Sequence, residues 1–155
     1  MSLLNGQVTN SSQKGSRAER ELVNTLTDCG LAAMRCPASG SATDRDLPDV
    51  LAMRPVAPTP RPPRAEVLAI EVKATAGTTA YADGDEIEAL TRFADAAGAT
   101  AYLAGRFDRD RSYYLVEPRF CRVTDEAGRY GVPQADAERR AGYVVDASVG
   151  EVRQP

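Results

Sequence analysis

Residues 66–75 read EVLAIEVKAT, and they form the clearest β-strand pattern in the chain. Successive side chains of a strand alternate between its two faces, so Leu68 and Ile70 share one face. Glu71 and Lys73 are neighbours on the other face, in a strand apolar enough to be central in a sheet. Taken alone, an acid and a base two residues apart are most often an ordinary ion pair on a half-exposed strand. The surrounding sequence decides whether this pair has a chemical role.

The segments around this strand predict an α/β fold. Apolar residues at helical spacing favour helices over 17–29 and 86–97, the first ending at Gly30 and the second at Gly98. In chain order, strands are predicted over 31–36, 50–53, 66–75, 99–107, 112–117 and 143–146, with a turn over 77–85. This order predicts a mixed central β-sheet flanked by helices.

The predicted domain boundaries follow changes in the pattern. Residues 1–13 are polar and aperiodic, which predicts a flexible tail. Residues 14–118 carry most of the predicted elements and form the main domain. The pattern weakens over residues 119–155, which are predicted to be an extension packed on the same domain. Residues 54–64 (RPVAPTPRPPR) hold five prolines and three arginines, which predicts a stiff, extended connector.

The composition excludes several kinds of chemistry. The 155 residues contain no histidine, which removes Ser-His-Asp and Cys-His catalysis and histidine-based zinc sites. The three cysteines form no CxxC motif, which argues against a zinc site or a disulfide framework. Only Lys14 and Lys73 are lysines, whereas all other basic residues are arginine. Carboxylates, hydroxyls, lysine and arginine remain as the groups available for catalysis.

Charge and hydropathy bear on partners and location. The net charge of −3 and the pI near 5.1 give no overall basic field, so a nucleic-acid partner would need a local basic patch. No apolar stretch reaches the ~20 residues that a membrane span requires, and residues 1–13 lack the features of a signal peptide. We therefore predict a cytoplasmic protein that does not bind membranes.

A second acid precedes the predicted strand over 50–53. Pro48 and Asp49 lead directly into that strand. If it pairs with the strand over 66–75 as a hairpin, Asp49 reaches the face that carries Glu71. Two carboxylates converging with a lysine are typical of a magnesium site, because Mg²⁺ prefers oxygen ligands and often binds through one or two carboxylates. Pro-Asp is also a common turn dipeptide, so the inference depends on its combination with the E-V-K run.

Glu19 is a third candidate ligand with two open interpretations. It precedes Leu22 and Val23 on the apolar stripe of the first helix, which places a carboxylate on the face toward the core. Ser16 and Glu19 also match the S-x-x-E capping box, in which the glutamate bonds the backbone at the start of a helix. Spacing alone favours neither interpretation. The acidic run DGDE at 83–86 lacks the length of a calcium loop and is predicted to cap the second helix.

Basic and hydroxyl residues near the first helix and strand complete the candidate set. Four basic residues cluster there, namely Lys14, Arg17, Arg20 and Arg35. They would form a local phosphate-binding strip if the acids face inward, or else a solvated helix face. Ser39 has no histidine to activate it as a nucleophile, and it is predicted instead to donate to a phosphate from the loop over 37–47.

One known family matches several of these runs. The sequence resembles the archaeal Holliday junction resolvase (Hjc) family of PD-(D/E)xK nucleases in KGSRAERELVNTL (14–26), MRCPASGSATDRDLPDVLA (34–52) and LAIEVKAT (68–75). The similarity continues through 81–110 and SYYLVEP (112–118). It implies a restriction-endonuclease-like core, a symmetric homodimer, and a four-way DNA junction as the substrate.

The resemblance also implies the composition of the active site. Glu19, Asp49 and Glu71 correspond to the metal-ligating acids of the family, and the Val72 carbonyl to a further oxygen ligand. Lys73 corresponds to the motif lysine that orients or activates the attacking water. The implied cofactor is Mg²⁺, for which Mn²⁺ can substitute, with no small-molecule cofactor.

The resemblance extends to DNA contacts, with two departures. Ser39 falls in the loop that approaches the scissile strand, and Arg20 and Arg35 match positions that bind the junction. The connector over 54–64 is longer and richer in proline than is usual for the family. Ala97 stands where family members often carry an aromatic residue in the dimer-contact helix, which affects the expected dimer interface.

The leading hypothesis is therefore a Mg²⁺-dependent, structure-selective endonuclease that resolves Holliday junctions by paired symmetric nicks during recombination and repair. One alternative is a PD-(D/E)xK nuclease that acts on other DNA structures. The other is a catalytically silent DNA-binding module, in which the acids are structural. The silent module predicts no metal dependence, and the intact set of acids and lysine argues against it.

Overall fold

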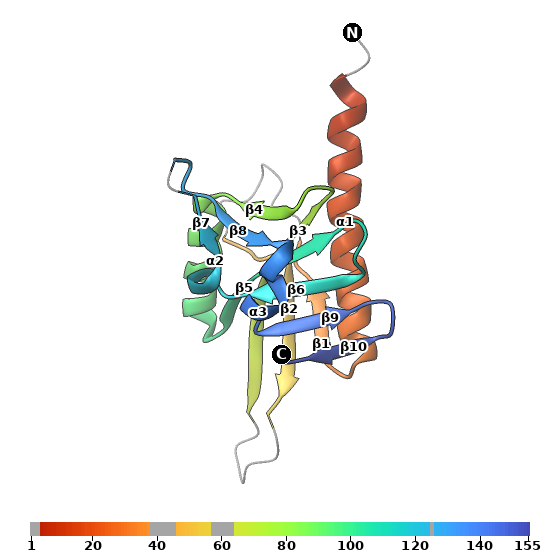
Figure 1. Ribbon diagram of the computed structural model, residues 1–155. Coiled ribbons are helices and arrows are strands. Elements are labelled where there is room, and N and C mark those ends of the chain that lie inside the picture. Colours follow the sequence, from red (N-terminus) through yellow and green to blue (C-terminus); the bar gives the residue numbers. More distant parts are fainter. Residues whose placement is uncertain (1–3, 38–45, 57–63, 125) are drawn as a thin grey trace.

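The computed structural model describes residues 4–37, 46–56, 64–124 and 126–155 (Figure 1). Its longer elements, in chain order, are α1 (Leu4–Asp28), β1 (Ala32–Arg35), β2 (Val50–Pro55), β3 (Ala65–Thr75), β4 (Thr79–Ala82), α2 (Gly84–Ala97), β5 (Thr100–Phe107), β6 (Ser112–Val116), β7 (Arg122–Val123), β8 (Tyr130–Pro133), α3 (Ala137–Arg140), β9 (Tyr143–Asp146) and β10 (Glu151–Arg153). Two 3₁₀ turns cover Pro118–Phe120 and Gln134–Asp136. Over the ranges described, no helix is both long and apolar enough to cross a membrane.

Strand β3 is an internal strand of a seven-stranded sheet with the order β1-β2-β3-β5-β6-β9-β10. It pairs antiparallel with β2 and parallel with β5, and the crossover between β3 and β5 contains β4 and α2. A parallel pair needs such a long connection, because a tight hairpin can join only antiparallel strands. The mixed sheet confirms the predicted α/β class and the predicted central position of the strand over 66–75.

Helices cover both faces of this sheet. On one face, Leu22 and Leu26 of α1 are buried against a cluster that includes Ile70 of β3. On the other face, Ile87 and Leu90 of α2 are buried beside a three-stranded sheet with the order β4-β8-β7. Spacings of three and four residues place these side chains on one stripe of each helix. Each such side chain contributes about 1.5–3 kcal/mol when fully buried, so the stripes fix both helices on the sheet.

Residues after 118 add strands to both sheets. Strand β9 pairs with β6 in the large sheet, and β8 pairs with β4 in the small one. The strands β4, β7, β8 and β10 are two to four residues long and were not predicted from the sequence. Such short strands show too few alternating positions to be recognised locally. Because β4 lies within 77–85, the predicted turn is wrong there.

Helix α1 begins at Leu4 rather than near Arg17. Residues 4–13, assigned to the predicted tail, are therefore helical, and the predicted start of the helix is wrong. Helix elongation adds one hydrogen bond for each residue fixed, so an anchored helix can continue through a polar segment without proline. Gly15 lowers helix stability by about 1 kcal/mol but does not end the helix. The other predicted helices and strands are present, with ends that move by one or two residues.

Candidate active site

The pairing of β2 with β3 brings the two candidate acids together. Val50 lies opposite Ile70 in this antiparallel pair, which places Asp49 beside Glu71 where β2 begins. The Asp49 N–H donates to the Ile70 carbonyl at 3.0 Å, and the Val72 N–H donates to Asp49 Oδ2 at 2.8 Å. The two strands thus form the hairpin on which the predicted convergence of the acids depended.

Asp49 and Glu71 are partly buried acids, and the cation paired with Glu71 is Lys73, at 3.7 Å. Burial and the neighbouring Asp49 carboxylate raise the pKa of Glu71 to about 8, although Lys73 opposes the rise. Burial also raises the pKa of Asp49. The hydrogen bond from the Val72 N–H acts in the opposite direction, because it favours the charged form. Folding therefore leaves two adjacent carboxylates whose charged forms are destabilised, and a bound cation would stabilise them.

The chemistry of this donor set fits a divalent metal ion. Mg²⁺ prefers oxygen ligands and is often bound through one or two carboxylates, with water or phosphate completing its coordination. Within the part of the chain that is described, no three Asp, Glu, Cys or His side chains are already arranged as a metal-binding group. Asp49 and Glu71 are therefore the core of the candidate metal site rather than a complete ligand shell.

Glu19 lies well inside α1, which rules out the capping-box interpretation of this residue. Its carboxylate accepts hydrogen bonds from Arg35 Nε at 3.0 Å and from Arg35 Nη2 at 2.8 Å. The Glu19 side chain is 18% exposed. Burial is the main cause of the raised pKa of Asp49, and the negative charge of Glu19 also raises it. Glu19 therefore lies at the edge of the acid cluster, where a guanidinium from β1 holds it.

Lys73 has two acidic neighbours, and the predicted site contains only one of them. Its Nζ lies 2.7 Å from Glu86 Oε1 and 3.7 Å from Glu71 Oε1. Burial lowers the pKa of Lys73, but the hydrogen bond and charge of Glu86, together with Glu71 and Asp49, outweigh burial and raise it above its usual value. Lys73 is therefore a charged hydrogen-bond donor in this structure.

Glu86 also has the capping role that the sequence predicts for the run at 83–86. Its Oε2 accepts a hydrogen bond from the Asp83 N–H at 2.9 Å, and the two residues form a capping box at the start of α2. Because the capping pattern explains Glu86 by itself, the local sequence gives no reason to connect it with Lys73. The connection arises because the chain after β3 returns the start of α2 to the face of β3 that carries Lys73.

The predicted roles of Val72 and Ser39 remain predictions. Val72 lies between Glu71 and Lys73, and its side chain is buried in the cluster under α1. Its carbonyl remains a predicted metal ligand. Ser39 lies outside the described residues, so its predicted place near the scissile strand is not tested.

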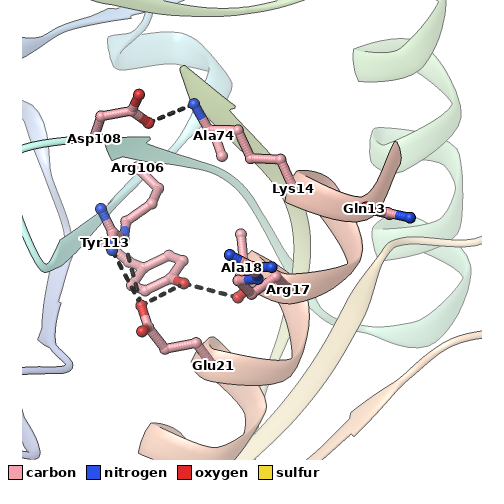
Figure 2. A pocket seen from close by; sticks show the side chains of 9 residues that line it. All are labelled: Gln13, Lys14, Arg17, Ala18, Glu21, Ala74, Arg106, Asp108 and Tyr113. Atoms are coloured by element: carbon pink, nitrogen blue, oxygen red, sulfur yellow. Dashed lines mark hydrogen bonds and ion pairs between the residues drawn. The ribbon is translucent and has the colours of Figure 1, made fainter. Parts of the chain in front are cut away.

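Three of the four basic residues follow one another along α1, where Arg17 lines one pocket with Lys14 and another with Arg20. Arg35 is bound to a glutamate at the acid cluster, and Arg20 is exposed on α1. Lys14 and Arg17 line a pocket of about 380 Å³ on the α1 side of the sheet, where Lys14 forms an ion pair with Asp108 (Figure 2). Their contacts with DNA remain predictions.

The pocket in Figure 2 contains a further partly buried carboxylate, Glu21, whose side chain is 29% exposed. Its Oε1 accepts hydrogen bonds from the Tyr113 hydroxyl at 2.9 Å and from Arg106 Nε at 3.4 Å. Arg111 Nη2 donates to the other carboxylate oxygen at 3.0 Å. Two guanidinium groups thus face one carboxylate, which makes this cluster a neutralised structural network rather than a second acid site.

Comparisons with known proteins agree with this geometry. The family described as "Archaeal holliday junction resolvase (hjc)" matches residues 10–149. The crossover junction endodeoxyribonuclease Hjc of Sulfolobus acidocaldarius is 33% identical over 118 residues, which cover 76% of this chain and 74% of the relative. The protein of the same name from Sulfurisphaera tokodaii is 30% identical over 133 residues, which cover 85% of this chain and 84% of the relative.

A solved structure gives the same result at the level of the fold. The structure of Archaeoglobus fulgidus Hjc, a Holliday junction resolvase from an archaeal hyperthermophile, matches with a TM-score of 0.66 at 27% sequence identity. The match covers 88% of this chain and 100% of that chain.

Fold and site together define a class. A mixed sheet with P-D entering one strand and E-x-K on the strand paired with it is the core of the PD-(D/E)xK nucleases, a restriction-endonuclease-like fold that implies a divalent metal. The chain belongs to the archaeal Holliday junction resolvase (Hjc) family. The family resemblance and the fold predicted from the sequence are both confirmed.

Proposed function

We propose that this protein is a Mg²⁺-dependent, structure-selective endonuclease that resolves four-way DNA junctions by paired symmetric nicks during recombination and repair. The observation that carries the proposal is the pair formed by Asp49 and Glu71, two partly buried carboxylates that converge at the start of β2 and whose pKa values are both raised. Lys73 lies beside this pair as a charged donor. Relatives named crossover junction endodeoxyribonuclease support a DNA junction as the substrate.

The roles of the individual residues follow from their positions. Asp49, Glu71 and Glu19, with the Val72 carbonyl, would hold the metal. When bound, Mg²⁺ polarises the scissile phosphate and stabilises the leaving oxygen, and Mn²⁺ can substitute because it takes similar oxygen ligands. Lys73 donates a hydrogen bond to the attacking water or to a phosphate oxygen, a role that its charged state supports.

Other side chains would bind the phosphate backbone. Arg17 and Arg20 are exposed on α1, and the Lys14 side chain is 40% exposed, so each can reach a DNA strand that passes along this helix. Arg35 holds Glu19 in place and adds positive charge at the edge of the acid cluster. Ser39 would donate to the phosphate near the point of cleavage.

Symmetry would account for paired nicks. Two copies related by a two-fold axis present two active sites, one to each of two opposed strands of a junction. Within each copy, residues 14–118 would form the nuclease core and residues 119–155 an extension packed on it. The pairing of β9 with β6 supports this arrangement of the extension.

Cleavage of a synthetic four-way junction tests the proposal, with linear duplex of the same sequence as the comparison and Mg²⁺, Mn²⁺ or EDTA in the buffer. We expect symmetric nicks on the junction alone, and only with metal. Cleavage of both substrates would keep the active site but assign it to a nuclease of broader substrate range. Tight junction binding without cleavage under any metal would contradict catalysis and leave a DNA-binding module.

A further inference from the structure

We propose that Glu86 is a positioning residue that holds the Lys73 ammonium group at the active site. The inference rests on the proposed nuclease function and adds a residue to it. Glu86 comes from helix α2, outside the P-D and E-x-K runs, and its only role apparent in the sequence is that of a helix cap.

The Glu86 carboxylate connects two structural elements through its two oxygens. Oε1 accepts the hydrogen bond from Lys73 Nζ at 2.7 Å, and Oε2 accepts the Asp83 N–H at 2.9 Å. Ile87 and Leu90, which follow on the helix, are buried in the core. The carboxylate is therefore fixed from behind by the capping box and by the packing of α2, and it presents one oxygen to the lysine.

Glu86 also decides which acid Lys73 binds. The distance from Lys73 Nζ to Glu71 Oε1 is 3.7 Å, which is longer than a hydrogen bond. Without Glu86, the ammonium would be free to bind Glu71 directly, since both side chains project from the same face of β3. A direct bond would occupy a Glu71 oxygen that the proposed metal site requires. Glu86 thus keeps the charged lysine close to the active site while leaving Glu71 available to the proposed metal ion.

A fixed partner matters because a lysine side chain is long and flexible. It carries about 2 kcal/mol of rotamer entropy, and a charged donor is effective only when it is held in the geometry of the reaction. The Lys73 side chain is 29% exposed, so packing alone does not immobilise it. The bond to a carboxylate that is itself anchored supplies the missing restraint.

Substitutions at Glu86 and its neighbours separate positioning from capping. Glu86→Gln retains an amide oxygen for the cap but removes the charge that binds Lys73. Asp83→Ala removes the other half of the capping box and leaves the Glu86 carboxylate in place. Glu88→Gln is the matched control, because Glu88 is an exposed acid on the same helix. Single-turnover cleavage of a four-way junction at saturating Mg²⁺, junction Kd in EDTA, and Tm are measured for each.

We expect Glu86→Gln to lower the cleavage rate by about 10- to 100-fold, the range that small misplacements of a reacting group produce, with Kd and Tm close to wild type. Asp83→Ala should lower Tm and keep the rate within about twofold of wild type, since it does not touch the lysine. Glu88→Gln should match wild type in all three measurements. Glu86→Asp keeps the charge but shortens the reach, and its rate should fall between those of wild type and Glu86→Gln.

Two results would overturn the proposal while leaving the nuclease function intact. One is a wild-type rate for Glu86→Gln. The other is a loss of rate in Asp83→Ala equal to that in Glu86→Gln, measured at a temperature where both are folded, which would reduce Glu86 to a cap. A wild-type protein that does not cleave the junction at all would instead refute the function proposed above.

Discussion

Two partly buried glutamates on opposite sides of the sheet differ in the charges that surround them. Glu21 on α1 receives hydrogen bonds from Tyr113 and Arg106, which line the pocket of Figure 2, and from Arg111. Glu71 on β3 has Asp49 as a neighbour, and its nearest cation, Lys73, is bound more closely to Glu86. One carboxylate is neutralised by its surroundings, and the other is not.

The difference separates an acid that stabilises the fold from an acid that is available for chemistry. A buried charge that is fully paired adds to stability only modestly, but removing its partner is costly. A buried charge without a partner destabilises the protein and is typical of a site that binds a ligand or performs catalysis. Glu71 and Asp49 are closer to the second kind, because their partners do not offset burial and the pKa of each is raised.

The largest effect should come from Asp49→Asn. The change removes a charged ligand from the proposed metal site but keeps the shape of the side chain. We expect the rate of junction cleavage to fall by about 10³-fold, equivalent to about 4 kcal/mol of transition-state stabilisation, with junction binding retained. Single-turnover cleavage and binding assays measure the two quantities. Full activity in this variant would remove Asp49 from the active site.

Glu21→Gln should give the converse result, a loss of stability with little loss of chemistry. Arg106 is 16% exposed at its side chain and would lose its charged partner Glu21, which is 29% exposed. We expect the free energy of unfolding to fall by about 1.5 kcal/mol, measured as a shift of the urea midpoint at unchanged m-value. Cleavage per folded molecule should remain near wild type. Unchanged stability would show that Glu21 does not contribute to the network as its contacts suggest.

Glu71→Gln should stabilise the metal-free protein at neutral pH. The pKa of Glu71 is about 8 in the folded protein against an ordinary value of 4.5, so between these values the folded state holds more protons than the unfolded state. The free energy of unfolding of the wild type should therefore fall as pH rises from about 4.5 to 8 through this group. At pH 7 we expect the variant to be more stable by about 2 kcal/mol.

Urea unfolding in EDTA at pH 5 and at pH 7 measures this effect, and the difference between variant and wild type should be smaller at pH 5. Glu21→Gln is the control, since it should destabilise at both pH values. If Glu71→Gln destabilised the metal-free protein at pH 7, Glu71 would be an acid that stabilises the fold, as Glu21 is.

Lys14→Ala should have the smallest effect on stability. Lys14 and Asp108 form an ion pair whose side chains are 40% and 46% exposed, and such pairs contribute little in water. We expect a change of less than about 0.5 kcal/mol in the free energy of unfolding. If Lys14 also binds a phosphate, the slope of log Kd for the junction against log salt should fall by about 1. An unchanged slope would restrict this residue to its ion pair.

Much of the active site could be predicted from the sequence because its residues lie in short, continuous segments with recognisable patterns. Alternation along EVLAIEVKAT places Glu71 and Lys73 on one face, and Pro48-Asp49 opens a strand that needed only to pair as a hairpin. The apolar stripes of both helices and six of the seven strands of the large sheet are visible for the same reason. Periodicity within a segment is a local property, so local patterns record it.

Tertiary structure decided which groups meet across segments. The bond between Glu86 and Lys73, the bond between Arg35 and Glu19, and the network around Glu21 all join residues that only the sheet register and the crossover bring together. The raised pKa of Glu71 depends on burial, which no single segment determines. Short strands such as β4 and β8 exist because they pair with each other. Contacts between distant residues are set by packing of the whole chain, and a pattern within one segment cannot specify them.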